Sequence, residues 1–340
     1  MSFTTPKTAL VIGATGGVGG SVARALLARG WHVRALNRHP DAAAKSAVGL
    51  ANVEWIAGDA MKAADVIAAA RGADLIVHGA NPPGYRNWGG LVLPMLDSTI
   101  AAAKAGGARI LFPGTVYNFG PDAGAVVDER SPQNPKTRKG AIRVEMERRL
   151  EAASHDGVRT VLVRAGDFFG PHTSGNSWFS NVLAQPGKPV RMMMYPGPKA
   201  VGHAWAYLPD LAETMVDLVE RSDAFAVFEV FHFNGHWLSP GVEMAQAVRR
   251  VLNRPKLSIL PAPWTLIRVM ALFNETFREM LEMRYLWNRP LRLDNAKLVA
   301  ALGAEPHTPL DRAVLDSLTG LGCMPADATK SSPHSATLLA

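Results

Sequence analysis

The stretch LVIGATGGVGG, Leu10–Gly20, decides the fold. Its glycines Gly13, Gly16 and Gly19 follow the apolar run Ala9–Ile12, which predicts a short buried strand, and the residues after them predict a helix. Such a tight strand-to-helix turn needs positive φ, close packing and backbone N–H groups that no Cβ shields. Because the helix N-terminus adds unpaired N–H donors and partial positive charge, the stretch predicts a site for the diphosphate of a dinucleotide.

The composition is that of a globular protein, with 340 residues of which 48% are hydrophobic and 19% charged. This length predicts about two domains or one elaborated α/β domain. The one cysteine, Cys323, excludes an intramolecular disulfide framework and fits a reducing compartment. The start has no long apolar segment typical of a secretory signal, and no run approaches the roughly 18 apolar residues of a spanning helix. We therefore expect a soluble, cytoplasmic protein without a membrane partner.

The net charge of +7 raises the question of nucleic-acid binding. The positive residues are scattered, and the densest group, within residues 136–151, is mixed with three glutamates at helical spacing. This mixture favours a solvated helix face. We expect no nucleic-acid partner, and expect any basic pocket to serve a phosphorylated cofactor. No spacing of His, Cys and carboxylates indicates a metal site.

Further apolar runs alternate with helical stretches of ten or more residues. This alternation predicts right-handed crossovers and a parallel sheet with both faces covered, so the fold class is α/β, a doubly wound sheet of Rossmann type. Ligands in such sheets bind beyond the carboxyl ends of the strands. The predicted strands after the first are Trp31–Leu36, Val53–Ala57, Asp74–His78, Arg109–Phe112 and Arg159–Arg164.

The domain organisation follows from composition. Residues 1–170 form the dinucleotide-binding core, and 203–235 return to its sheet. Residues 171–202 and 236–323 form a smaller, mostly helical substrate-binding part, and 324–340 are predicted to be a disordered tail. The apolar stretch 264–284 is expected to be one helix that buries a core or pocket face. Its alternatives are a contact in a homodimer and a membrane surface.

The end of the second strand, Asn37 and Arg38, bears on the choice of cofactor. In dinucleotide folds an acidic residue at this place accepts from the ribose 2′-hydroxyl of NAD(H), whereas an arginine accommodates the 2′-phosphate of NADP(H). The acid is missing here and Arg38 is present. NADP(H) is therefore favoured and NAD(H) is the alternative, in which Arg38 is an ordinary surface residue.

Six motifs occur in order along the chain: GATGGVGG at 13–20, GD at 58–59, HGAN at 78–81, VYNFGP at 116–121, RAGDFFGP at 164–171 and HAWAYLPDLAE at 203–213. Together they resemble the extended short-chain dehydrogenase/reductase family, in particular its NAD(P)-dependent epimerase/dehydratase type, over residues 7–323. The resemblance implies a diphosphate site at Gly13, Thr15, Gly16, Gly17, Val18 and Gly19. It also implies ribose contacts from Asn37 and Arg38, adenine contacts from Asp59 and Ala60, and an approach to the middle of the cofactor by Gly79, Ala80 and Asn81. Asp59 has the alternative of a helix N-cap.

The resemblance also implies a Ser or Thr after the fifth strand, and a Tyr followed four residues later by a Lys, which together transfer a proton and hold the cofactor. The chain departs from this pattern. Pro113 and Gly114 stand where the hydroxyl is usual, Lys139 falls at the Tyr position and Arg143 at the Lys position.

The candidates for the proton chemistry are therefore unconventional. Arg143 can hold a ribose hydroxyl or a phosphate. Lys139 can donate a proton if burial or Arg143 lowers its pKa; the alternative is an exposed lysine. Thr115 and Tyr117 are the nearest hydroxyls to the fifth strand, although Tyr117 commonly has a supporting role in the family.

His203 and His232 are expected to be packed and hydrogen-bonded, and Asp167 either caps a loop or meets substrate. The sequence thus predicts an NADP(H)-dependent oxidoreductase or epimerase/dehydratase-like enzyme for a small carbonyl or alcohol substrate. The alternative is a catalytically weak or inactive NADP(H)-binding sensor, since the usual Tyr and Lys are missing.

Overall fold

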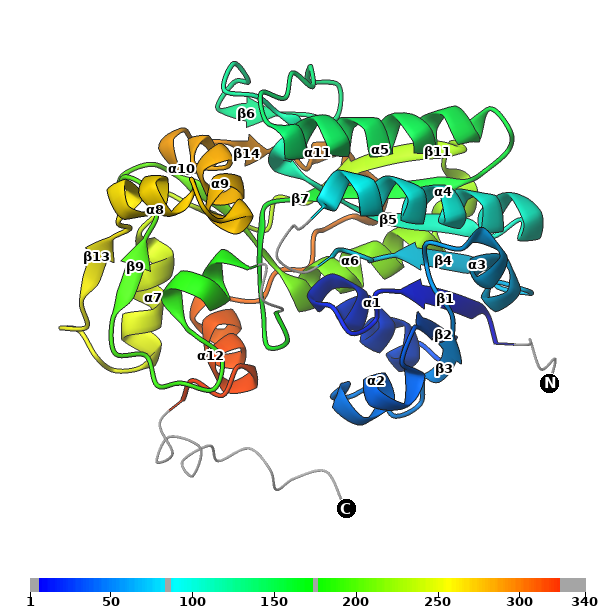
Figure 1. The fold of residues 1–340 in the computed structure, drawn as a ribbon, viewed down its shortest axis with the longest axis horizontal. Helices are drawn as coiled ribbons and strands as arrows, with labels where there is room; N and C mark the ends of the chain where they lie inside the picture. The colour runs from blue at the N-terminus through cyan, green and yellow to red at the C-terminus, as the bar shows by residue number, and fades with distance from the viewer. Residues whose placement is uncertain (1–5, 83–86, 174–176, 325–340) are drawn as a thin grey trace.

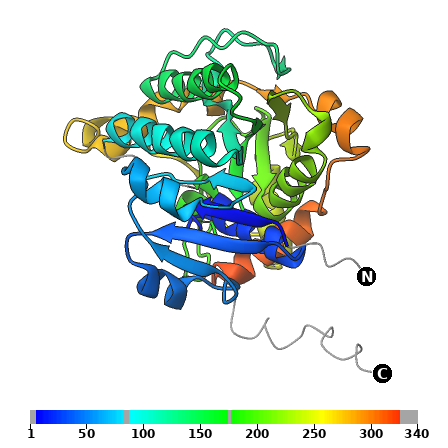
Figure 2. The same ribbon diagram turned by 90° about the vertical axis from the view of Figure 1, so that its right-hand side faces the viewer.

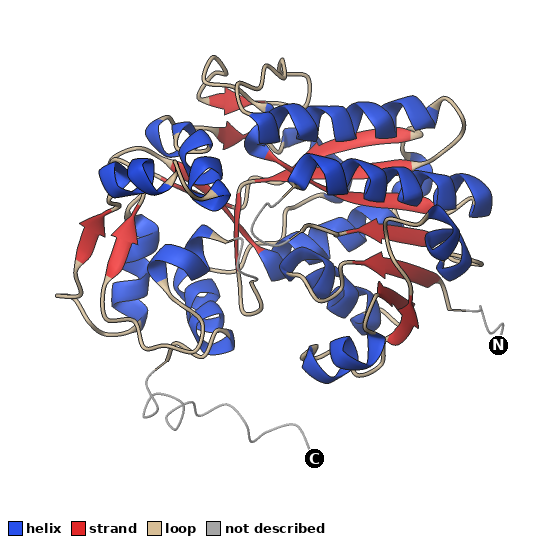
Figure 3. Cartoon of the chain, viewed as in Figure 1, coloured by secondary structure: helices blue, strands red, loops and turns tan. Residues whose placement is uncertain are grey.

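A computed structural model describes residues 6–82, 87–173 and 177–324. Its centre is a parallel sheet of seven strands in the order β3-β2-β1-β4-β5-β7-β11, which confirms the predicted doubly wound fold (Figures 1 and 3). The chain turns back between β1 and β4, the place where such sheets bind ligands. The strands are β1 (Thr8–Ile12), β2 (His32–Asn37), β3 (Glu54–Ala57), β4 (Leu75–His78), β5 (Arg109–Thr115), β7 (Thr160–Ala165) and β11 (Phe228–His232).

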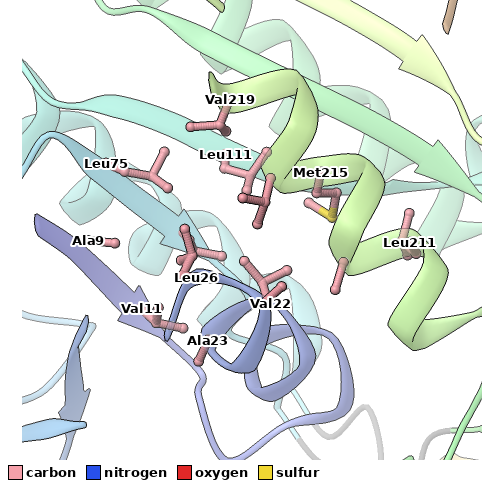
Figure 4. Packing of buried hydrophobic residues seen from close by; sticks show 14 of the residues in the cluster. Ala9, Val11, Val22, Ala23, Leu26, Leu75, Leu111, Leu211, Met215 and Val219 are labelled. Atoms are coloured by element: carbon pink, nitrogen blue, oxygen red, sulfur yellow. The ribbon is translucent and has the colours of Figure 1, made fainter. Parts of the chain in front are cut away.

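Helices cover both faces of this sheet (Figure 2). Alternate strand residues point to opposite faces, so Val11 packs with α1 and α6 on one side (Figure 4) while Ile12 lies in the cluster on the other side. The first face carries α1 (Gly17–Ala28) and α6 (Leu208–Glu220), and the second carries α3 (Ala63–Ala69), α4 (Trp88–Gly106) and α5 (Arg138–Ser154). A short helix that the sequence did not predict, α2 (Pro40–Ser46), follows β2.

The rest of the chain forms a smaller, mostly helical part with an aromatic core around Phe169, Trp205 and Trp287. Three small sheets support it: β8 (Asp167–Phe169) with β10 (His203–Tyr207) and β12 (His236–Leu238), β9 (Met193–Tyr195) with β13 (Ile259–Pro261), and β6 (Val126–Val127) with β14 (Arg292–Leu293). Its helices include α7 (Glu243–Val251), α8 (Trp264–Met270), α9 (Glu275–Glu282), α10 (Tyr285–Asn288) and α12 (Leu310–Gly320), whereas α11 (Ala296–Leu302) packs on the core of the main sheet.

Two links fasten the smaller part to the sheet domain. The first is the β6–β14 pair, since β6 lies in the loop after β5 and β14 lies near the end of the chain. The second is the Asp210 carboxylate of α6, which accepts 2.7 Å hydrogen bonds from the backbone N–H and the hydroxyl of Thr308. Of the segment 203–235, β11 returns to the main sheet as expected, whereas β10 joins the small sheet.

The single helix expected over residues 264–284 is wrong. The segment is divided into α8 and α9 by a turn after Met270. Ile267 of α8 is buried, but Leu272 and Phe273 in the turn are 73% and 82% exposed. The seven-residue α8 carries apolar residues on more than one side, and only one side can face the core. The expected burial is therefore also wrong for much of 266–273.

The C-terminal tail predicted to be disordered lies, from residue 325 on, outside the described residues. In the part of the chain that the structure describes, no helix combines the length and the apolar character needed to cross a bilayer. The cytoplasmic location and the homodimer stay predictions.

Candidate active site

A cavity of about 400 Å³ opens at the carboxyl ends of β1, β4, β5 and β7, where the sheet meets the smaller part. Most of the residues singled out from the sequence line it. From the glycine turn and the HGAN motif these are Gly13, Thr15, Gly16, Gly17, Val18, Gly79, Ala80 and Asn81, and from the catalytic candidates Thr115, Tyr117 and Arg143.

The glycine turn has the geometry that a diphosphate site needs. Gly13 has a φ of +89°, and a Cβ on it would lie 2.6 Å from the carbonyl carbon of Gly79. A Cβ on Gly19 would lie 2.4 Å from the Gly13 oxygen, so Gly19 does not line the cavity but lets α1 approach β1. Gly16 is the N-cap residue of α1, and no acidic side chain stands in the first helical turn. The unpaired N–H groups at this helix start therefore meet no competing negative charge from the first turn of α1 itself.

The residues predicted to meet the adenosine half lie beyond this cavity, after β2 and β3. The strands are held together there by a 3.1 Å hydrogen bond from Gly58 N to Asn37 O, so Arg38 and Asp59 follow adjacent strand ends. Arg38 is exposed. The alternative of Asp59 as a helix N-cap is wrong, because α3 begins after Lys62, and the Asp59 carboxylate instead accepts from Met61 N at 3.0 Å. The cofactor contacts of Asn37, Arg38, Asp59 and Ala60 stay predictions.

Lys139 does not line the cavity that holds the glycine turn. Its Nζ lies 3.3 Å from Oε2 of Glu279, and both side chains are almost fully buried. Burial lowers the pKa of Lys139, while the negative charge of Glu279 opposes this shift. The alternative of an exposed lysine is therefore wrong. The positive charge that adds to burial in lowering the pKa of Lys139 is that of Arg138, and not that of Arg143. The structure does not bring Lys139 together with Thr115 and Tyr117.

Arg143 does line the cavity, next to the carboxyl end of β5. Its Nη1 donates to the carbonyl oxygen of Pro113 at 3.4 Å, and its guanidinium lies over the rings of Trp88 and Phe112. Stacking on two aromatic rings suits a guanidinium and fixes its plane. The structure thus presents a permanent cation and hydrogen-bond donor to the cavity.

The absence of a side chain at position 114 has a packing cause. Gly114 on β5 pairs with Arg164 on β7, and a Cβ on Gly114 would lie 2.8 Å from Cγ of Arg164. The buried Arg164 side chain makes two hydrogen bonds to the Glu147 carboxylate, of 3.1 and 2.6 Å. Because this ion pair fills the space beside β5, a side chain at position 114 does not fit.

A pair that the sequence did not assign lies at the cavity wall. Asp167 lines the cavity, and its Oδ2 lies 2.7 Å from Nε2 of His203. His203 is stacked on Trp287 with a centroid distance of 3.7 Å and an interplanar angle of 11°. His203 is therefore packed and hydrogen-bonded as predicted, and it holds the carboxylate of Asp167, a residue of the cavity wall. The signal in the sequence was the position of Asp167 just after a strand.

His78 is a further lining residue, and its tautomer can be assigned. Thr99 Oγ1 donates to Met95 O, so it accepts from His78 Nδ1 at 2.7 Å, and this leaves Nε2 as an acceptor. His78 Nε2 is buried and has no hydrogen-bond partner among the residues that the structure describes. Burial, assisted by the charge of Arg143, lowers the pKa of His78 to about 3. The neutral ring thus offers a lone pair and no proton.

His232 is packed as predicted. The structure buries it completely, with Nε2 3.1 Å from Arg164 Nη1 and Nδ1 3.2 Å from Val127 O. Burial, with the charge of Arg164, lowers the pKa of His232 to about 3. Since arginine only donates, Nε2 is the acceptor and Nδ1 carries the proton.

We expect acid to destabilise the fold through these two histidines. In the unfolded chain each takes up a proton below its ordinary pKa of 6.5, whereas the folded ring stays neutral down to about 3. The unfolded state therefore binds more protons in this window, and the free energy of unfolding falls as the pH falls. Well below pH 6.5 each histidine contributes about 1.4 kcal/mol per pH unit. Urea unfolding between pH 7 and 5 of the parent and His78→Gln measures this slope.

The variant is expected to show a shallower slope than the parent. His39→Gln is the control, since His39 is exposed and a change there should leave the slope unaltered. Equal slopes for the parent and His78→Gln would contradict the assignment of a buried neutral ring.

Comparison with known families gives a match to the model of the NAD dependent epimerase/dehydratase family over residues 9–233. The chain belongs to this family. The match covers the glycine turn and every strand of the main sheet except the N-terminal residue of β1. Among curated proteins no significant match was found.

Solved structures of epimerases share the fold over nearly their whole length. UDP-glucuronic acid 4-epimerase from Bacillus cereus in complex with NAD has a TM-score of 0.72 at 15% identity, over 92% of this chain and 98% of that one. UDP-glucose 4-epimerase from Bifidobacterium longum in complex with NAD+ and UDP has a TM-score of 0.69 at 16% identity, with the same coverage. A nucleoside-diphosphate-sugar epimerase from Pseudomonas aeruginosa has a TM-score of 0.70 at 18% identity, over 93% and 97%.

Proposed function

We propose that this epimerase/dehydratase-family protein is an NADP(H)-dependent enzyme that acts on a carbonyl or alcohol group of a small substrate. The observation that carries the proposal is the single cavity that joins the glycine turn to Tyr117, Arg143 and Asp167. The similar epimerases with bound NAD support a nicotinamide cofactor. When bound, this cofactor supplies or accepts the hydride.

The residues of the chain would divide the remaining tasks. Backbone N–H groups of Gly16, Gly17 and Val18 bind the diphosphate at the start of α1. Arg143 offers a fixed donor to a ribose hydroxyl or to substrate. The neutral His78 accepts a hydrogen bond from a group inside the cavity. Lys139 has no part in this proposal, because its ammonium is paired with Glu279 outside the cavity lining.

The proton has three candidate carriers on the cavity wall: Tyr117, Thr115 and Asp167. Thr115 Oγ1 accepts from Tyr117 N at 3.3 Å, which ties the two hydroxyl residues into one turn. Asp167 differs from them, because His203 can exchange a proton with its carboxylate across 2.7 Å. A carboxyl supported by imidazole is a competent acid and base. We propose Asp167 as the carrier, and Tyr117 and Thr115 as the groups that orient the substrate oxygen.

The test is turnover of NADPH or NADP+ with a panel of small carbonyls, alcohols and UDP-sugars. Asp167→Asn should lower kcat by about 100-fold or more, the usual loss for a proton carrier, and leave the Kd for cofactor within about threefold. Tyr117→Phe and Thr115→Val should have smaller effects on kcat. If Asp167→Asn retains full kcat while Tyr117→Phe loses it, Tyr117 is the carrier.

A catalytically inactive sensor is the second candidate, and the observation that favours it is Pro113 and Gly114 at the hydroxyl position. In that case the protein binds NADPH tightly, but no substrate of the panel is turned over. Binding without turnover across all three substrate classes would replace the enzyme proposal with this one.

Arg38 is proposed to select NADP(H). It is exposed and makes no ion pair with any residue that the structure describes, so its guanidinium is available to a 2′-phosphate at the end of β2. Arg38→Ala should weaken NADPH binding by about tenfold or more, the value of one charge-assisted hydrogen bond, and change the Kd for NADH by less than about twofold. Calorimetric titration with both cofactors measures this. Equal affinities of the parent for NADPH and NADH would contradict the assignment.

A further inference from the structure

The apolar surface of α8 and the turn after it stands out from the rest of the molecule. In the described part of the chain eleven large hydrophobic side chains are exposed, and five of them lie within eight residues. These five are Leu266, Val269, Met270, Leu272 and Phe273, called here the α8 tip. Scattered exposed hydrophobics are ordinary, whereas a contiguous group marks an interaction site.

The α8 tip is held outward by contacts beneath it. Ile267 and Ala271, on the opposite side of α8, are buried in the smaller part. Trp264 at the helix start donates from Nε1 to Pro196 O at 2.7 Å, and the guanidinium of Arg284 lies 4.9 Å from its ring centre. The helix is thus anchored by one face, and it lies at the end of the molecule remote from the N-terminal sheet strands (Figure 1).

The charges around the α8 tip are basic. Arg268 of α8 and Arg278 of α9 are exposed and make no ion pair within the described ranges. The acidic residues of α9 have partners: Glu275 and Glu279 pair with Arg138, and Glu282 accepts from Arg138 N. The apolar tip is therefore flanked by free cations, in a chain with a net charge of +7.

The apolar area of the α8 tip argues against a second copy of the chain as its binding partner. Five side chains present on the order of 500 Å² of apolar surface, about the size of the largest patch on an ordinary monomer. A standard protein interface buries about 800 Å² on each partner. A lipid surface needs no matching area, because each side chain that enters it contributes separately.

We propose that the α8 tip docks on a membrane surface that contains anionic lipids. Leu272 and Phe273 enter the interface between headgroups and acyl chains, and Arg268 and Arg278 contact the lipid phosphates. This is attachment to one leaflet and involves no spanning helix. It differs from the prediction of no membrane partner, which assumed that residues 264–284 bury their apolar side chains. It is independent of the proposed enzyme activity.

Vesicle sedimentation with the purified full chain tests the proposal. Vesicles of phosphatidylcholine with 30% phosphatidylserine should bind the protein at least about tenfold more strongly than pure phosphatidylcholine, and salt should weaken this binding. The double substitution Leu272→Ser and Phe273→Ser should reduce binding by about tenfold or more. Arg268→Gln with Arg278→Gln should remove most of the preference for phosphatidylserine.

Two measurements keep the test decisive. Val126→Ser with Val227→Ser removes two exposed valines elsewhere and should leave vesicle binding unchanged. Cofactor affinity and the unfolding midpoint of the tip variant should equal those of the parent, which shows that the fold is intact. Failure to bind either vesicle overturns the proposal, as does full binding by the tip variant. A dimer in sedimentation velocity that the tip variant loses, without vesicle binding, assigns the surface to a second copy instead.

Discussion

Gly19→Ala is expected to weaken dinucleotide binding by at least about 100-fold, which is about 3 kcal/mol. The added Cβ would lie 2.4 Å from the carbonyl oxygen of Gly13 and 2.8 Å from its carbonyl carbon. Both atoms belong to the backbone, so no side chain can rotate away, and α1 must move from the end of β1. This movement displaces the N–H groups that are proposed to bind the diphosphate. Calorimetric titration with NADPH and NADH measures the loss.

Gly30→Ala is the matched control for this substitution. Gly30 lies just beyond the other end of α1, has a φ of +77°, and has open space where a Cβ would be. Alanine there should cost about 1 kcal/mol of stability from the left-handed backbone and leave cofactor affinity unchanged. If Gly19→Ala bound cofactor as tightly as Gly30→Ala, the close approach of α1 to β1 would not be what positions the diphosphate site.

Glu147→Gln is expected to lower the free energy of unfolding by about 3–5 kcal/mol. Glu147 and Arg164 are both buried, and two hydrogen bonds join their side chains. Glutamine keeps the shape but removes the negative charge, so the Arg164 cation remains buried beside the neutral His232. Urea unfolding at pH 7 measures the change.

Glu145→Gln is the control, two residues away on the same helix. Its carboxylate also binds arginines, Arg148 and Arg149, but at the surface, where such pairs contribute about 0–1 kcal/mol. A double variant, Glu147→Leu with Arg164→Met, should lose less than the sum of its single substitutions, because no unpaired charge is left. Equal losses for Glu147→Gln and Glu145→Gln would mean that the buried pair does not stabilise the fold.

The sequence predicted the main sheet and the glycine turn because their causes are local. A strand, a glycine turn and a helix follow one another within 20 residues, and periodicity places the strands. The Asp167–His203 pair could not be predicted, since its residues are 36 positions apart and meet only when β8 pairs with β10. The need for glycine at position 114 could not be predicted either, because it arises from the side chain of Arg164 on the neighbouring strand β7.

The segment 264–284 shows a prediction from local sequence that failed. Its apolar residues indicated a buried helix. Composition alone, however, does not say which sides of a helix the rest of the chain will cover, and here several apolar side chains stay exposed. Lys139 is a similar case: its place at the start of α5 was predicted, whereas its partner Glu279 comes from α9, which lies 140 residues further along.

The β6–β14 pair and the Asp210–Thr308 bonds bear on how proteins of this family can be recombined. Residues 292–308 return to the sheet domain between α10 and α12 of the smaller part, so the two parts are interlaced along the chain. A chimera cut once, at residue 235, would leave β6 without its strand partner and Asp210 without its donors. Exchange of substrate specificity between relatives therefore calls for transplanting separate loops, and a whole C-terminal half is the wrong unit of exchange.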